Sequence, residues 1–127
     1  MHVEEWFSKS DTYADLARVS VQRGHHDAAC FLAQQAVEFF VKGLLIVKTG
    51  AKAYSHSLLE LFAALASTGL KVPDNVSGCT RLLSGHYLQA RYPDARLDPY
   101  TSEESTTALE CMEVILDFLR RVRSGAR

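Results

Sequence analysis

The spacing of apolar residues restricts this chain more than any other feature of its sequence. Apolar side chains recur three and four residues apart along nearly all 127 residues, and no segment alternates cleanly with a period of two. The pattern predicts an all-α protein with helices over residues 3–23, 26–48, 57–69 and 73–91, and a last helix from 102 to about 124. Short connections favour an antiparallel up-and-down bundle of four to five helices, forming a single domain over residues 1–127.

Glycine, proline and capping residues set the predicted helix ends. A glycine follows each of the first two helices, at positions 24 and 50. Ser57 with Glu60, and Thr101 with Glu104, have the spacing of a capping box at a helix start. Pro93 stops the fourth helix and disfavours helical angles at the residue before it.

The segment 26–48 is apolar on nearly every side. A helix of that kind is buried on nearly every side, so it is the central helix of the bundle or partly a dimer interface, and both can hold at once. The first helix is expected to be less apolar, and it places one set of apolar residues on one side: Trp6, Tyr13, Leu16, Ala17 and Val21.

Polar residues of the segment 26–48 form one narrow stripe. Gln35, Glu38 and Lys42 follow each other at spacings of three and four, with Gln34 beside them. One interpretation is an ion pair between Glu38 and Lys42 that supports the helix, worth a few tenths of a kcal/mol. The other is a polar seam that faces a groove.

Composition indicates an ordinary globular protein. Hydrophobic residues make up 47% of the chain, charged residues 23%, and the formal net charge is −1. This excludes a disordered tail and disfavours tight non-specific binding to nucleic acid, which needs a basic surplus. The N-terminus does not resemble a signal peptide.

Cysteine usage and hydropathy lead to two further expectations. Cys30, Cys79 and Cys111 are far apart and odd in number, which predicts reduced core thiols in a cytoplasmic protein. The most apolar stretch, FFVKGLLIV, contains Lys42 and is judged too short to span a membrane, so no membrane association is expected.

The stretch YLQARYPDAR, residues 87–96, combines aromatic and charged side chains at a helix end. Tyr87 and Arg91 are four residues apart and share a helix face, and the turn at Pro93 exposes Tyr92 and Asp94. In a structural interpretation, Arg91 bonds the last carbonyls of its helix or pairs with Asp94, while Tyr87 closes the core. In a functional one, Arg91 binds a phosphate and a tyrosine stacks on the ligand.

Three ordered elements resemble the HEPN domain. They are FLAQQAVEFFVKGLLIVKTG with Gln35, Glu38 and Lys42, then YSHSLLEL with His56, then YLQARYPD with Tyr87, Arg91, Tyr92 and Asp94. The resemblance covers almost the whole chain. It implies a helical bundle, commonly a homodimer, often encoded beside a minimal nucleotidyltransferase in a toxin–antitoxin arrangement. Some members are proposed to bind nucleotides, so Lys42 and His56 are candidates to face the same groove as Arg91.

Other members of the family are metal-independent endoribonucleases that use an arginine and a histidine four to six residues apart. Arg81 and His86 fit that spacing, but about one chance match is expected in such a chain, and Arg18 with His25 also fits. On a regular helix the side chains of Arg81 and His86 point about 140° apart. We therefore expect a surface arginine and a half-exposed histidine without a catalytic role.

Neither a metal nor a cofactor is expected. His25, His26 and Asp27 are adjacent and diverge by about 100° per residue on a helix, and no glycine-rich phosphate loop is present.

The basic cluster at the end of the chain is interpreted as a solvated helix terminus, with Asp117 pairing with Arg121. Its members are Arg120, Arg121, Arg123 and Arg127.

Overall fold

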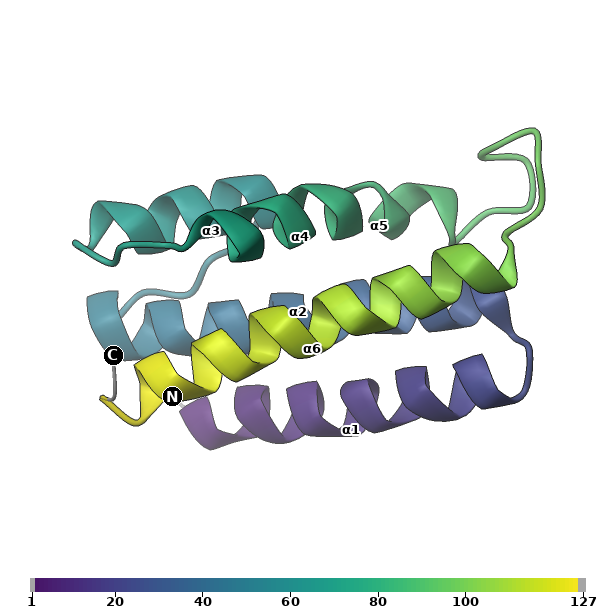
Figure 1. Cartoon of the computed structure of the whole chain (residues 1–127). Coiled ribbons are helices and arrows are strands. Elements are labelled where there is room, and N and C mark those ends of the chain that lie inside the picture. Colours follow the sequence, from purple (N-terminus) through teal and green to yellow (C-terminus); the bar gives the residue numbers. More distant parts are fainter. Residues whose placement is uncertain (1, 126–127) are drawn as a thin grey trace.

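A computed structural model describes residues 2–125, and in that range it is all helical (Figure 1). The helices are α1 (Val3–Gln22), α2 (His26–Thr49), α3 (Leu58–Ser67), α4 (Asp74–Ser84), α5 (His86–Gln89) and α6 (Ser102–Arg123). They lie nearly parallel or antiparallel, with α3 to α5 on one side of α2, α1 on the other, and α6 packed across α2. The predicted all-α bundle is confirmed.

Local signals act at most of the predicted helix ends. Gly50 ends α2 in the left-handed conformation with φ +75°, which favours glycine. Thr101 and Glu104 form the predicted capping box at the start of α6. At α3 only half of the predicted box forms: Ser57 accepts a hydrogen bond from the Glu60 N–H, but the Glu60 carboxylate bonds the Ser55 hydroxyl at 2.7 Å.

The predicted fourth helix differs most from the structure. It breaks at Gly85 into α4 and the single turn α5, and it ends at Gln89, two residues before the predicted end. Arg91 N–H bonds the Leu88 carbonyl at 3.2 Å, which is the tighter bonding of a closing turn. Pro93, which disfavours helical angles at Tyr92, explains why the helix does not resume.

Helix α2 is the central helix, and it contacts α1, α3, α4, α5 and α6. Most of its apolar surface is therefore covered within one chain, so α2 is the central helix, and a dimer interface on part of it stays a prediction. By length and composition alone the whole of α2 is apolar enough to cross a membrane, a test that the mostly buried core helix of a globular protein also passes. The most apolar window of α2 is 72% buried inside the protein, as expected of a core helix.

The core face of α1 differs from the side on which the sequence groups its apolar residues. Buried in α1 are Phe7, Ser10, Ala14 and Ala17, and the Ser10 hydroxyl donates to the Ala36 carbonyl at 2.7 Å. Leu16 is 43% exposed. Trp6 and Tyr13 are only half-buried. The small residues Ser10, Ala14 and Ala17 let α1 approach α2 closely. The larger side chains of Trp6 and Tyr13 lie at the edge of this contact.

Two of the three cysteines are bonded, which corrects the expectation of three reduced thiols. A disulfide joins Cys79 of α4 to Cys111 of α6, whose Cα atoms lie 4.9 Å apart. Cys30 is free and buried in α2, and burial raises the pKa of its thiol to about 12. The pairing depends on α4 packing against α6, which the spacing of the cysteines in the sequence does not reveal.

The predicted contact at the C-terminal cluster is present. Arg121 pairs with Asp117 at 3.7 Å, while Arg120 reaches Asp11 at 3.5 Å. Arg123 donates two hydrogen bonds to Glu4, both 2.7 Å, and its guanidinium lies 3.7 Å from the centre of the Phe7 ring. Arg127 lies outside the described residues.

Candidate functional site

A buried carboxylate organises the polar stripe of α2. Glu38 is 3% exposed and accepts hydrogen bonds from Lys42 at 2.9 Å and from His56 at 2.8 Å. Gln34 and Gln35 each donate to its other oxygen at 3.1 Å. The ion pair of the first interpretation exists, and it is more than local helix support because it is buried and continues to His56 outside the helix. Lys42, itself 6% exposed, offsets the charge that Glu38 brings into the core.

His56 is oriented by that carboxylate. A carboxylate only accepts hydrogen bonds, so the Nδ1 atom of His56 donates and its Nε2 atom is left for other partners. The His56 side chain is 53% exposed. The loop before α3 thus presents an imidazole in a defined orientation at the surface.

An aromatic and cationic layer continues from His56. The imidazole stacks on Tyr87 of α5 with centroids 4.7 Å apart and planes 10° apart. The Arg91 guanidinium lies 4.7 Å from the centre of the Tyr87 ring, 5.2 Å from that of Tyr92 and 6.0 Å from that of Phe31. We call His56, Tyr87, Arg91 and Tyr92 the His56–Arg91 stack. Five of the predicted site residues, these four and Lys42, are joined by contacts.

Arg91 has aromatic neighbours and no carboxylate partner. Among the described residues it forms no ion pair within 4.0 Å, whereas nearby Arg96 pairs with Glu104 at 2.8 Å. The pairing of Arg91 with Asp94 that the sequence allowed is absent from this range, and Asp94 is exposed. The guanidinium donors of Arg91 therefore face solvent.

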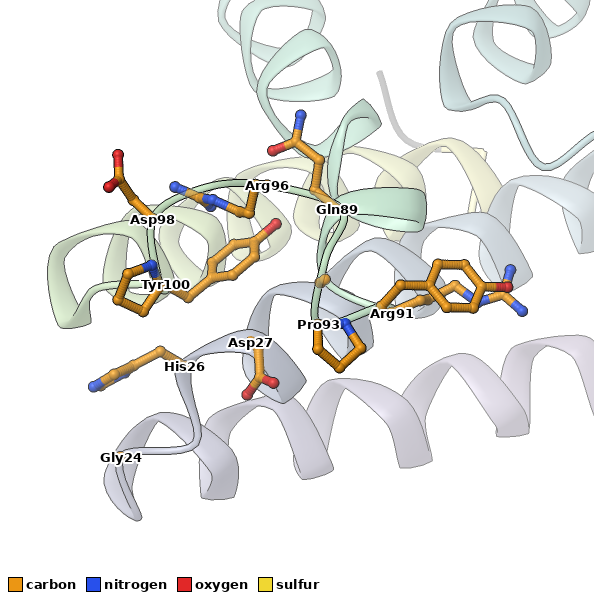
Figure 2. Close-up of a pocket in the computed structure, with 12 residues that line it drawn as sticks. Gly24, His26, Asp27, Gln89, Arg91, Pro93, Arg96, Asp98 and Tyr100 are labelled. Atoms are coloured by element: carbon orange, nitrogen blue, oxygen red, sulfur yellow. The ribbon is translucent and has the colours of Figure 1, made fainter.

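A cavity of about 330 Å³ lies beside the stack (Figure 2). Its walls come from Gly24 in the turn between α1 and α2, from the first turn of α2 with His26 and Asp27, and from the loop between α5 and α6 with Arg96 and Tyr100. Figure 2 shows Arg91 at the edge of this cavity, extending away from Gly24 and His26. The guanidinium is thus at the rim.

A network behind the cavity holds the loop that carries Arg91 and Tyr92. His86 Nδ1 and the Tyr100 hydroxyl are 2.7 Å apart, and the Arg96 guanidinium lies 4.1 Å from the centre of the Tyr100 ring. Burial lowers the pKa of His86 and raises that of Tyr100, and the hydrogen bond from Arg96 lowers the pKa of Glu104. These side chains fasten the loop to α6.

The Arg81 and His86 pair is not assembled. Arg81 is exposed and lines a hollow between α3 and α4 with Phe62 and Val72. His86 is 8% exposed, so the expectation of a half-exposed histidine is wrong, and it borders a different hollow with Glu104. No hydrogen bond joins the two side chains. Among residues 2–125, no group of three or more His, Cys, Asp or Glu residues could hold a metal ion.

Sequence reasoning missed two members of the site. Glu38 was placed in the polar stripe but not among the site residues, although its spacing to Lys42 was the available signal. Phe31 was taken for core, and it lies beneath Arg91. Neither sequence spacing nor composition shows that the loop before α3 returns to Glu38.

The model of the HEPN domain family matches residues 3–122 of the chain. Among solved structures, TT1696 from Thermus thermophilus is 32% identical, with a TM-score of 0.85 over 94% of this chain and 96% of that one. ST0689, described as an archaeal HEPN homologue, is 28% identical with a TM-score of 0.75, covering 94% and 96%. A HEPN domain protein from Thermotoga maritima, 20% identical with a TM-score of 0.75 over 94% and 98%, shows the same fold. No curated protein matches.

Proposed function

Because the chain belongs to the HEPN domain family, we propose that it is a binding module for a phosphate-bearing ligand, a nucleotide or RNA, held at the His56–Arg91 stack. The observation that carries this proposal is the Arg91 guanidinium, which lies on aromatic rings and has no carboxylate partner among the described residues. A planar guanidinium binds phosphate oxygens through two parallel hydrogen bonds, and adjacent rings can stack on a base.

The surroundings of Arg91 support binding. Tyr92 is 50% exposed and next to the guanidinium, so it is available to a base. Tyr87 is held between the fixed imidazole of His56 and Arg91, which preorganises the stack before a ligand arrives. Lys42 serves the site indirectly, because it neutralises the carboxylate that orients His56.

Ribonuclease activity through Arg81 and His86 is the weaker alternative. The buried His86 is hydrogen-bonded to Tyr100, and Arg81 borders a separate hollow. A general acid or base must reach the substrate atom to which it transfers a proton. Arg81 and His86 do not border one common hollow in which a substrate could contact both side chains.

Homodimerisation and pairing with a minimal nucleotidyltransferase, in a toxin–antitoxin arrangement, are proposed on the family resemblance alone. Other helices cover most of the apolar surface of α2, so that surface supports a dimer less strongly than the sequence suggested. A cytoplasmic location also stays a prediction, since the disulfide removes the argument from three reduced cysteines.

Isothermal titration calorimetry with AMP and ATP tests the proposal. Arg91→Gln should weaken binding at least tenfold, and Arg81→Gln, which removes an exposed arginine elsewhere on the surface, is the matched control. Binding that is equal in the folded Arg91→Gln protein and in wild type would place the site elsewhere. If neither nucleotide nor RNA binds to the wild-type protein, the proposal is wrong.

A further inference from the structure

One face of α2 is not covered by another helix. In Figure 1, α1 and α3 to α5 flank α2, and α6 crosses it on a single side. Phe31, Gln35 and Phe39 are only half-buried, whereas most of the residues between them are buried. At about 100° per residue these three side chains span about 80° of the helix circumference, so they lie in one strip along α2.

Aromatic residues of α1 border this strip. Phe39 packs against Trp6 and Tyr13, with ring centroids 6.0 and 5.0 Å apart. Trp6, Lys9 and Tyr13 follow each other at spacings of three and four and therefore share one side of α1. We call Trp6, Lys9, Tyr13, Phe31, Gln35 and Phe39 the aromatic face. The three residues that α1 contributes to the aromatic face lie outside the buried core: Trp6 and Tyr13 are half-buried and Lys9 is exposed.

Three cations lie on this face or at its ends. Lys9 is 5.6 Å from the centre of the Phe39 ring, Lys52 is 5.6 Å from that of Trp6, and Arg91 is 6.0 Å from that of Phe31. None of the three has a carboxylate within 4.0 Å among the described residues. Other cations that lie on rings differ in this respect: Arg96 and Arg123 are paired with Glu104 and Glu4. The face thus combines stacking rings with positive charge that no acidic residue neutralises.

The length of the face exceeds a single nucleotide site. Phe31 and Phe39 are eight residues apart on α2, which is ~12 Å along the helix axis. Arg91 lies at the Phe31 end, and Lys52 with the exposed Tyr54 lies beyond the Phe39 end. One base on Tyr92 cannot also reach Trp6.

We propose that the aromatic face binds a single-stranded polynucleotide along α2, with its phosphates on Arg91, Lys9 and Lys52 and its bases on the intervening rings. The inference rests on the proposed function and extends it, because it assigns a second binding surface, the aromatic face of α1 and α2, which lies beyond the His56–Arg91 stack. Rings that alternate with cations are the general means of holding single strands without sequence preference. The net charge of −1 does not oppose this, since the acidic partners lie on other faces, for example Glu113 with Arg18.

A second copy of the chain fits this face less well. A two-fold interface brings the same face of both copies together, so Lys9 of one copy would meet the aromatic face of the other, and none of the six residues of that face is acidic. A polyanion supplies the missing negative charge along the whole face. Charge complementarity therefore selects the polynucleotide.

Fluorescence of Trp6, the single tryptophan of the chain, reports directly on the aromatic face. Titration with a 12-nucleotide oligoadenylate should quench Trp6 fluorescence, whereas AMP, bound at Arg91, should leave it unchanged. Three phosphate contacts predict that the logarithm of the binding constant falls with the logarithm of salt with a slope of about −2. Lys9→Gln with Lys52→Gln should lower the slope to about −0.7 and weaken oligonucleotide binding about 20-fold at 0.1 M salt. Binding of AMP should not change.

Lys71→Gln is the matched control, because Lys71 is an exposed lysine on the loop between α3 and α4 with no ion pair among the described residues. If the double variant binds the oligonucleotide as tightly as the Lys71→Gln protein does, the inference is wrong. In that case, weaker AMP binding by Arg91→Gln would still support the proposed function. Failure of wild type to bind the oligonucleotide also overturns the inference. If the double variant instead converts a dimer to a monomer in sedimentation equilibrium, a second copy occupies the face and the inference is wrong.

Discussion

His56 and Tyr87 stack with their rings 4.7 Å apart and nearly parallel, at 10°. The contact joins the loop before α3 to α5. The same imidazole also donates a hydrogen bond from Nδ1 to the Glu38 carboxylate. The position of Tyr87 at the surface thus depends on a carboxylate in the core. Substitution of Glu38 in the core should therefore change the positions of His56 and Tyr87 at the binding surface.

Glu38→Gln should destabilise the protein by about 3–5 kcal/mol, because it leaves Lys42 charged and buried without its partner. Lys42→Met should cost less, since Glu38 keeps hydrogen bonds from His56, Gln34 and Gln35. Urea denaturation gives both free energies of unfolding. Combining the two substitutions should recover part of the loss, and strict additivity would show that the pair is not coupled.

Gly43→Ala should destabilise the contact between α1 and α2 by about 1–2 kcal/mol, although alanine favours helices. A Cβ atom at position 43 would lie 2.9 Å from the ring of Phe7, which is 2% exposed and packed against Phe40. Thermal unfolding measures the loss. Gly78→Ala is the control: its nearest neighbour atom is 3.9 Å away, so that helix substitution should be neutral or stabilising. Equal effects of the two substitutions would contradict the close approach.

Alkylation of the unfolded, unreduced protein should modify one thiol, Cys30, because Cys79 and Cys111 are bonded. Reduction should lower the free energy of unfolding by roughly 3–4 kcal/mol, the value for a closed loop of this length, since 32 residues separate the two cysteines. Mass spectrometry counts the modified thiols. Three modified thiols without reductant would show that the bond does not form in solution.

Acidification from pH 7.5 to 5 should lower stability through His86. Burial lowers the pKa of His86 in the folded protein below the ordinary value of 6.5. The unfolded chain then binds a proton that the folded protein does not, so stability is full above about pH 6.5 and declines below it. Glu104 and Glu113, whose pKa values are lowered by arginine partners, lose their contribution only below about pH 4.5. Chemical denaturation between pH 5 and 7.5 should show a smaller slope in His86→Gln, and an unchanged slope would assign the effect to another group.

Incubation of the purified protein with total RNA should leave the RNA intact. The reason is that Arg81 and the buried His86 border different hollows. Electrophoresis after incubation, with Arg81→Ala in parallel, checks this. Cleavage by wild type that Arg81→Ala abolishes would establish the ribonuclease alternative.

The helices were predictable because periodicity, caps and helix stops agree along the chain. Gly50 and the Thr101–Glu104 box act locally, so their effect can be read from a few neighbouring residues. The core face of α1 was not predictable in this way. A helical wheel shows where Trp6 and Tyr13 point relative to one another, but the side that α2 covers is chosen by the close fit of Ser10 and Ala14.

His56, Tyr87, Arg91 and Tyr92 were predictable as members of the candidate site, whereas Glu38, Phe31 and the contacts among these residues were not. His56 belongs to a different motif from Tyr87 and Arg91, and only the fold brings it into one stack with them. The disulfide has the same origin, because Cys79 and Cys111 meet where α4 packs on α6. His86 was misjudged because its burial depends on Tyr100, which returns to it from the far end of a loop.

The burial of α2 has a consequence for biosynthesis. Helix α2, which is as apolar as a membrane span, leaves the ribosome before α3 to α6, and α6, which covers one side of it, is the last of the described helices. Until α6 emerges, the nascent chain carries an open hydrophobic surface, the kind of surface that chaperones and membrane-targeting factors recognise. The interval between translation of α2 and translation of α6 is therefore the period in which this protein is most exposed to aggregation and to mistargeting.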